Sequence, residues 1–147
     1  MNWCKKQGMR LTEPSESLAE EYYKSAEETL RVSNLIKDSG SNMWLATQKY
    51  YTEYLLACAV LMRIGVKSEI HGCTIEVVRL LEKEEIIPFN FSHLLEADKH
   101  LRIENQYYLK NIPVKYDSLQ MRHVLLAIRE VLDALSTEKI EMIRKKI

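Results

Sequence analysis

Tyrosine is the residue type whose number and spacing in this sequence best suit recognition chemistry, because eight tyrosines stand against two phenylalanines. Seven of the tyrosines form three adjacent pairs and one position a helical turn beyond the second pair: Tyr22–Tyr23, Tyr50–Tyr51, Tyr107–Tyr108 and Tyr54. A tyrosine can pack its ring in an apolar layer while its hydroxyl stays hydrogen-bonded. The pairs therefore have two interpretations: packing residues near the surface of a helix bundle, or a polar seam that contacts a partner subunit or stacks on a base.

A second group, His93, Glu96 and His100, has a spacing that places all three residues on one face of a helix. Imidazole and carboxylate side chains can bind a metal ion if another segment completes the coordination shell. The same spacing is typical of a solvated polar face, and the chain lacks the two Glu-x-x-His repeats of carboxylate-bridged metal pairs in bundles. We expect no metal site and no cofactor.

Other binding and catalytic patterns are missing. The four glycines are isolated, which excludes a glycine-rich phosphate-binding loop, and the sequence has no Gly-x-Ser-x-Gly elbow. Twenty-one Lys and Arg residues balance 21 Asp and Glu residues, so the formal net charge is zero. This balance excludes a broad positive field for nucleic acid, but it leaves room for a local binding site.

Helices are the elements expected to position these side chains. Four glycines and three prolines in 147 residues are too few for the frequent turns of an all-β fold. Apolar residues recur at helical spacing in five segments, and no segment alternates as a strand would. The first two predicted helices run over 14–36, with a capping box at Ser17 and Glu20, and over 43–64, with Gly65 as the C-terminal cap. A third helix runs through 75–85. The fourth begins at a cap at Ser92 and ends at about 108, and the fifth begins at a cap at Asp117 or Ser118 and ends at 135. Residues 137–147 can extend the last helix.

The predicted fold is therefore all-α, an antiparallel bundle of about five helices with short connections. Residues 1–13 carry mixed signals and are expected to form a loose N-terminal arm, followed by a single helical domain over residues 14–147. The helix over 43–64 is apolar around most of its circumference from Tyr54 onward, which marks it as the central buried helix.

The cysteines and the apolar runs bear on the compartment. Cys4, Cys58 and Cys73 cannot all pair within the chain, and Cys58 in its apolar run is expected to be a small buried hydrophobe. A core of this size needs no disulfide, so a reducing compartment is the simplest expectation. The first residues lack the apolar stretch of a secretory signal, and the longest uncharged run of the central helix is far short of the ~20 residues of a membrane span. We expect a cytoplasmic protein with no membrane contact.

One ordered set of segments resembles a known family. A tyrosine-bearing helix over 46–62 is followed by Gly65, by a Lys-and-His loop over 67–72, and by an Arg-x-x-x-x-Tyr segment over 102–107. This order and spacing resemble the HEPN superfamily (higher eukaryote and prokaryote nucleotide-binding domains), especially its small stand-alone prokaryotic members. The resemblance covers residues 18–135, and it implies an antiparallel helical bundle that commonly dimerises, in agreement with the apolar periodicity.

The resemblance also implies ribonuclease chemistry, but one signature residue is missing. Many HEPN proteins are metal-independent ribonucleases whose motif is an arginine followed by four to six residues and a histidine. The histidine would handle the 2′-hydroxyl proton, and the arginine would stabilise charge on the phosphate. No arginine of this chain has a histidine at that offset, and the residues at the histidine offsets after Arg102 are Tyr107, Tyr108 and Leu109. A phenol with a pKa near ~10 is a poor base at neutral pH.

Arg102 and His71 each have a structural and a functional interpretation. Asp98 precedes Arg102 by four residues, which predicts a salt bridge within one helix. His71 can simply stand at the start of the third predicted helix, where Gly72 permits a tight turn. In the functional interpretation, His71, Arg102 and Tyr107 converge as a small polar site, with Tyr50 and Tyr51 as further binding residues.

Three functional hypotheses follow. The first is a HEPN-like homodimeric binding module that takes a nucleotide or RNA, or pairs with a small nucleotidyltransferase in a toxin–antitoxin-type system. The second is a divergent metal-independent ribonuclease that uses Arg102 with Tyr107 or His71. The third is a structural helical scaffold without catalysis.

Overall fold

A computed structural model describes all residues from Met1 to Ile147. The elements in chain order are α1 (Asn2–Gln7), β1 (Met9–Leu11), α2 (Glu16–Ile36), α3 (Asn42–Ile64), β2 (Val66–Ser68), α4 (His71–Lys83), α5 (Phe91–Gln106), α6 (Ser118–Ala134) and α7 (Thr137–Arg144). This architecture confirms the predicted all-α class, with seven helices instead of about five. No helix combines the length and the apolar composition that crossing a lipid bilayer requires.

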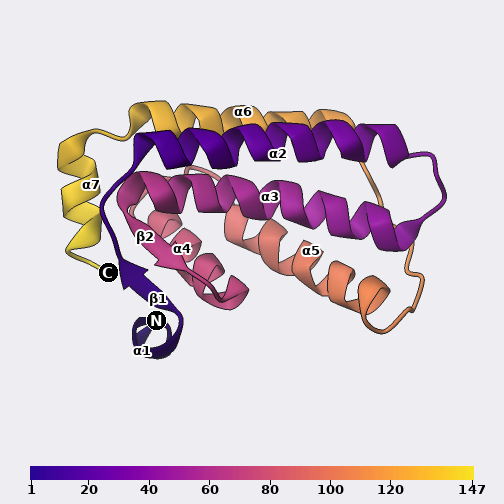
Figure 1. The fold of residues 1–147 in the computed structure, drawn as a ribbon, viewed down its shortest axis with the longest axis horizontal. Coiled ribbons are helices and arrows are strands. Elements are labelled where there is room, and N and C mark those ends of the chain that lie inside the picture. Colours follow the sequence, from indigo (N-terminus) through magenta and orange to yellow (C-terminus); the bar gives the residue numbers. More distant parts are fainter.

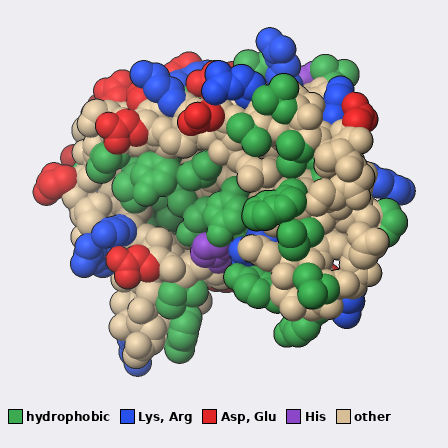
Figure 2. Space-filling model, turned by 45° about the vertical axis from the view of Figure 1, so that its right-hand side comes forward, with side chains coloured by type: hydrophobic (Ala, Val, Ile, Leu, Met, Phe, Trp, Pro, Cys, Tyr) green, Lys and Arg blue, Asp and Glu red, His purple; other side chains and the backbone are tan.

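The long helices form an antiparallel bundle around α3. Figure 1 shows α2, α3, α5 and α6 running alternately in opposite directions, and α3 contacts α2, α4, α5, α6 and α7. Every residue from Leu56 to Leu61 is buried, which confirms α3 as the central helix. One face of the molecule shows a band of hydrophobic side chains, with a histidine and a basic side chain beside it (Figure 2).

Two helix ends match the sequence signals, and two do not. Gly65 caps α3 in the left-handed conformation with φ of 74°, and Asp117 caps α6 by accepting hydrogen bonds from two backbone N–H groups. The cap of α2 is Ser15, which accepts from the Leu18 N–H, and the predicted capping box at Ser17 is wrong. The predicted cap at Ser92 is also wrong, because the Ser92 N–H and hydroxyl both donate to Glu82 and α5 begins one residue earlier.

Residues 137–147 do not extend α6. Leu135 is extended, with ψ of 102°, and Ser136 caps the separate helix α7 by accepting from the Lys139 N–H. The break lets α7 pack against the end of α3, where Arg144 donates to three backbone carbonyls, those of Thr12, Ile64 and Gly65. The bond to Ile64, the last residue of α3, satisfies a carbonyl group that the end of a helix leaves without a partner.

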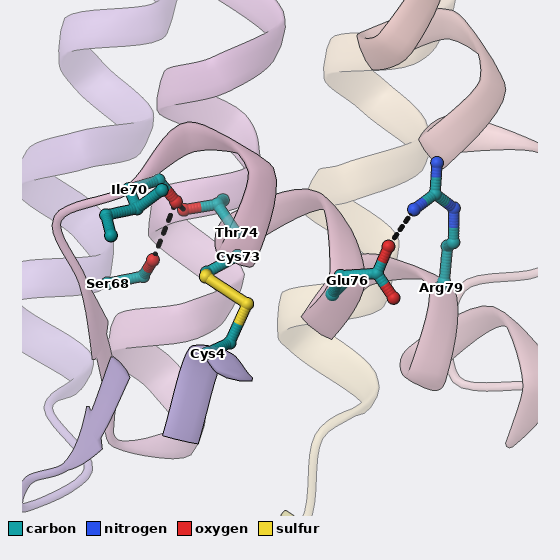
Figure 3. Close-up of a disulfide and its surroundings, with 7 residues drawn as sticks. All are labelled: Cys4, Ser68, Ile70, Cys73, Thr74, Glu76 and Arg79. Carbon is teal, nitrogen blue, oxygen red and sulfur yellow. Dashed lines mark hydrogen bonds and ion pairs between the residues drawn. A yellow bond between two sulfur atoms is a disulfide. The ribbon is translucent and has the colours of Figure 1, made fainter. Parts of the chain in front are cut away.

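The predicted loose arm over residues 1–13 is wrong, because α1 and β1 occupy most of it. β1 pairs antiparallel with β2, with Arg10 opposite Lys67. A disulfide joins Cys4 of α1 to Cys73 of α4 across 69 residues of sequence (Figure 3). The expectation that the chain forms no disulfide is therefore wrong for Cys4 and Cys73. Cys58 is free, and it is buried as predicted.

Candidate functional site

Arg102 lies among tyrosine rings where α5 crosses α3. Its guanidinium carbon is 5.0 Å from the ring centre of Tyr50, 5.5 Å from that of Tyr51 and 5.7 Å from that of Tyr107. These distances are within the range of cation–π attraction. Tyr54 and His71 complete the cluster, and we call these six residues the Arg102 site: Tyr50, Tyr51, Tyr54, His71, Arg102 and Tyr107.

His71 enters the site from the first turn of α4. Its ring stacks on Tyr54 with centroids 4.0 Å apart, and its Nδ1 lies 2.8 Å from the Tyr50 hydroxyl in a hydrogen bond. Burial lowers the pKa of His71, and the positive charges of Arg102 and Lys99 lower it further. The imidazole is therefore mainly neutral at pH 7. Burial raises the pKa of Tyr50 well above its usual range, so that phenol stays protonated.

Arg102 is a buried cation with no anionic partner. Its side chain contacts only neutral oxygens, the Tyr51 hydroxyl at 3.5 Å and the Gln106 carbonyl oxygen at 3.4 Å, both from Nη1. The Nε–H has no hydrogen-bond partner, although the residue is only 8% exposed. The predicted salt bridge with Asp98 is wrong, because Asp98 contacts Lys49 of α3 instead.

A buried ionic network lies on the same two helices. The Lys49 ammonium contacts Asp98 and lies 3.6 Å from Glu53 Oε2, and none of these side chains is more than 9% exposed. Burial raises the pKa of Glu53 well above its usual range, and the charge of Asp98 acts in the same direction, whereas the charge of Lys49 acts against it. Neither Glu53 oxygen accepts a hydrogen bond. Burial therefore favours the uncharged form of Glu53, and Asp98 is the carboxylate in direct contact with Lys49.

The sequence placed five residues in a candidate binding set, and the structure brings all five together: Tyr50, Tyr51, His71, Arg102 and Tyr107. Tyr107 is 63% exposed at the mouth of the site. Sequence reasoning missed the roles of Lys49 and Glu53. The available signal was a pair of opposite charges one turn apart in a helix that is otherwise apolar.

The remaining chemistry-bearing residues lie outside the site. Tyr23 is a packing residue, since its buried hydroxyl donates to the Leu125 carbonyl. Tyr108 faces Lys110 at 5.9 Å instead of Arg102. On α5, the Glu96 carboxylate lies 3.5 Å from His100 and 3.5 Å from Arg79, and no three His, Cys, Asp or Glu side chains gather as metal ligands anywhere in the chain.

No family model matches the chain, and no curated protein or solved structure matches it either. The chain is thus classed by its own geometry, as an all-α antiparallel bundle with a buried arginine enclosed by aromatic rings.

Proposed function

We propose that this protein is a HEPN-like helical binding module that holds a phosphate-bearing ligand, a nucleotide or RNA, in the Arg102 site. The observation that carries the proposal is a buried guanidinium without a carboxylate and with a free Nε–H. Burying a charge without a partner is costly, and tyrosine faces offset only part of that cost. A phosphate accepts two parallel hydrogen bonds from a guanidinium and would supply the missing negative charge.

Tyr107 gives the site a second recognition group. Its exposed ring lies 5.7 Å from the Arg102 guanidinium carbon, at the distance where a base could stack while its phosphate reaches the cation. The neutral whole-molecule charge fits a ligand that is held locally. For RNA, one phosphate contact predicts a slope of log affinity against log salt of about −0.7, far shallower than that of a polycationic binder.

The test is isothermal titration of the protein with nucleoside monophosphates and with short single-stranded RNA. We expect Arg102→Gln to lower the affinity at least about tenfold, which corresponds to about 1.4 kcal/mol. Arg31→Gln is the matched control, because the Arg31 side chain is 72% exposed on α2 and pairs only with Glu28. Tyr107→Leu should weaken base-bearing ligands and leave inorganic phosphate unaffected. Equal binding by wild type and Arg102→Gln would contradict the proposal.

A divergent metal-independent ribonuclease is the second candidate function. It is favoured by the neutral imidazole of His71 beside Arg102, since a neutral imidazole can accept the 2′-hydroxyl proton. The test is cleavage of end-labelled RNA in EDTA between pH 5 and 9. Activity that Arg102→Gln and His71→Asn both abolish would support an enzyme, with Tyr107→Phe testing the phenol. Intact RNA across the pH range would leave the binding module as the function.

The resemblance to HEPN proteins further supports a homodimer and a small nucleotidyltransferase as partner. Light scattering tests the dimer, and a monomer at high protein concentration would contradict it. Co-expression with a nucleotidyltransferase encoded beside this chain tests the partner through co-purification. A protein that binds no ligand and no partner in these assays would be the structural scaffold of the third hypothesis.

We also propose a cytoplasmic location, which the disulfide makes testable. Disulfides persist in oxidising compartments and are rare where glutathione keeps thiols reduced. In a reducing cytoplasm, acid quenching of cells followed by alkylation at neutral pH in denaturant should label Cys4 and Cys73 as thiols before mass spectrometry. A predominantly oxidised pair in freshly trapped cells would argue for another compartment.

A further inference from the structure

The unpaired state of Arg102 needs an explanation, because a partner stands on its own helix. Asp98 and Arg102 are four residues apart on α5, the spacing at which opposite charges normally pair. Both side chains are buried, so a salt bridge between them would relieve two desolvated charges together. The structure shows no such bridge, and Asp98 contacts Lys49 across the α3–α5 interface.

We infer that Lys49 is a positioning residue of the Arg102 site, which holds Asp98 away from Arg102 and so keeps the guanidinium free for an anionic ligand. This inference rests on the proposed function for its ligand. Its structural part is that Lys49 determines whether Asp98 contacts Lys49 or Arg102, and this part can be tested without any ligand.

The charges of the buried network support this role. Lys49 contributes one positive charge, Asp98 contributes one negative charge in direct contact with it, and burial without any exposure favours the uncharged form of Glu53. The network is therefore balanced without Arg102, whose charge is left over. Lys99 is no substitute partner for Asp98, because its ammonium lies 3.8 Å from Glu96. Without Lys49, Arg102, which lies one turn further along α5, is the remaining cation with which Asp98 can pair.

The position of Lys49 in the chain links the network to the site. Lys49 directly precedes Tyr50 and Tyr51, whose rings lie beside the Arg102 guanidinium. One turn of α3 thus supplies both the aromatic surroundings of the cation and the ammonium that occupies its competing carboxylate. The same turn can therefore hold a guanidinium in an aromatic enclosure and leave its N–H groups for phosphate oxygens.

Four variants test the inference by titration with inorganic phosphate and with AMP. Lys49→Met should lower the affinity at least about tenfold, because Asp98 turns to Arg102. Lys49→Arg should keep wild-type affinity, since it still holds Asp98. Asp98→Asn should also keep it, because the competitor is then uncharged. The double variant Lys49→Met/Asp98→Asn should recover binding to within about threefold of wild type. A double variant that folds but does not recover binding would overturn the inference.

Crystal structures of Lys49→Met and of the double variant provide the ligand-free readout. In Lys49→Met, an Asp98 oxygen should lie within salt-bridge distance of the Arg102 guanidinium, and an unpaired Arg102 there would overturn the inference. If Lys49→Met does not fold, the binding by Asp98→Asn and by the double variant still decides it. If wild type binds neither probe while Lys49→Met shows the new salt bridge, the proposed ligand is wrong and the steering of Asp98 by Lys49 stands.

Discussion

Removing the Cys4–Cys73 disulfide should lower the stability of this protein by several kcal/mol. The bridge joins residues 69 positions apart, so in the unfolded chain it closes a long loop. The chain-entropy relation for a loop of this length gives a loss of about 4 kcal/mol at 25 °C when the bridge is removed. For a chain of 147 residues, that loss corresponds to a decrease in Tm of about 13 °C.

The assay is urea denaturation of the Cys4→Ser/Cys73→Ser variant beside wild type, with and without dithiothreitol. We expect reduced wild type and the double variant to show the same decrease in the free energy of unfolding. Both should also have a larger m-value, because the unbridged unfolded chain exposes more surface. Cys58→Ala is the control, since Cys58 is free and that variant should keep the full response to reductant. A loss of less than about 1 kcal/mol in the double variant would refute the loop-closure reasoning.

Two further predictions concern a helix cap and the pH dependence of stability. Gly65→Ala should lower the free energy of unfolding by more than about 2 kcal/mol, because φ is 74° and a Cβ would lie 2.5 Å from the Thr12 carbonyl oxygen. Gly40→Ala, with similar φ but open space around the Cβ, should cost only about 1–2 kcal/mol, so equal losses in the two denaturation curves would contradict the steric cause. Glu53 has a raised pKa in the folded state. Its stabilising contribution to the free energy of unfolding is therefore fully present below about pH 4.5 and is lost as pH rises toward the folded-state pKa. Above about pH 5, Glu53→Gln should therefore remove a decline in the free energy of unfolding of at most about 1.4 kcal/mol per pH unit, and an unchanged slope in urea denaturation would contradict the raised pKa.

The parts of the fold that the sequence predicted are those fixed by long apolar periodicity and strong local signals. α2, α3, α5 and α6 each bury residues at helical spacing over four or more turns, so the pattern survives despite local exceptions. Gly65 and Asp117 could be identified as caps because the left-handed conformation and the side-chain acceptor are properties of single residues.

The parts that the sequence did not predict depend on contacts between distant segments. β1 and β2 have three residues each, too few for alternation to show, and their pairing is fixed by the disulfide and by close packing at Gly8. A Cβ on Gly8 would lie 2.5 Å from Ile70 Cδ1, so glycine permits this approach of the N-terminal segment to α4. Ser92 has the type of a capping residue, but Glu82 of the neighbouring helix takes both its donors.

For the candidate site, the order of segments identified the residues, and only the structure shows their partners. The likeness to HEPN motifs selected Tyr50, Tyr51, His71, Arg102 and Tyr107, and the antiparallel packing of α3 against α5 explains why the helix residues among them meet. Sequence distance alone could not show that residues 50 and 102 lie together, because that depends on the register of two helices.

Asp98 shows why the pairing rule for charges four residues apart failed at the position on which the proposed function depends. On an exposed helix, a partner four residues away contributes a few tenths of a kcal/mol, which is small enough for any stronger interaction to replace it. In the interior, a carboxylate is stable only beside a cation, and Lys49 supplies one in direct contact while burial favours the uncharged form of Glu53. The exchange leaves Arg102 buried, charged and enclosed by aromatic rings, and its Nε–H has no hydrogen-bond partner. A stable fold does not require that arrangement, since the pair with Asp98 was available to it, and this is the physical ground for proposing a ligand that completes the guanidinium.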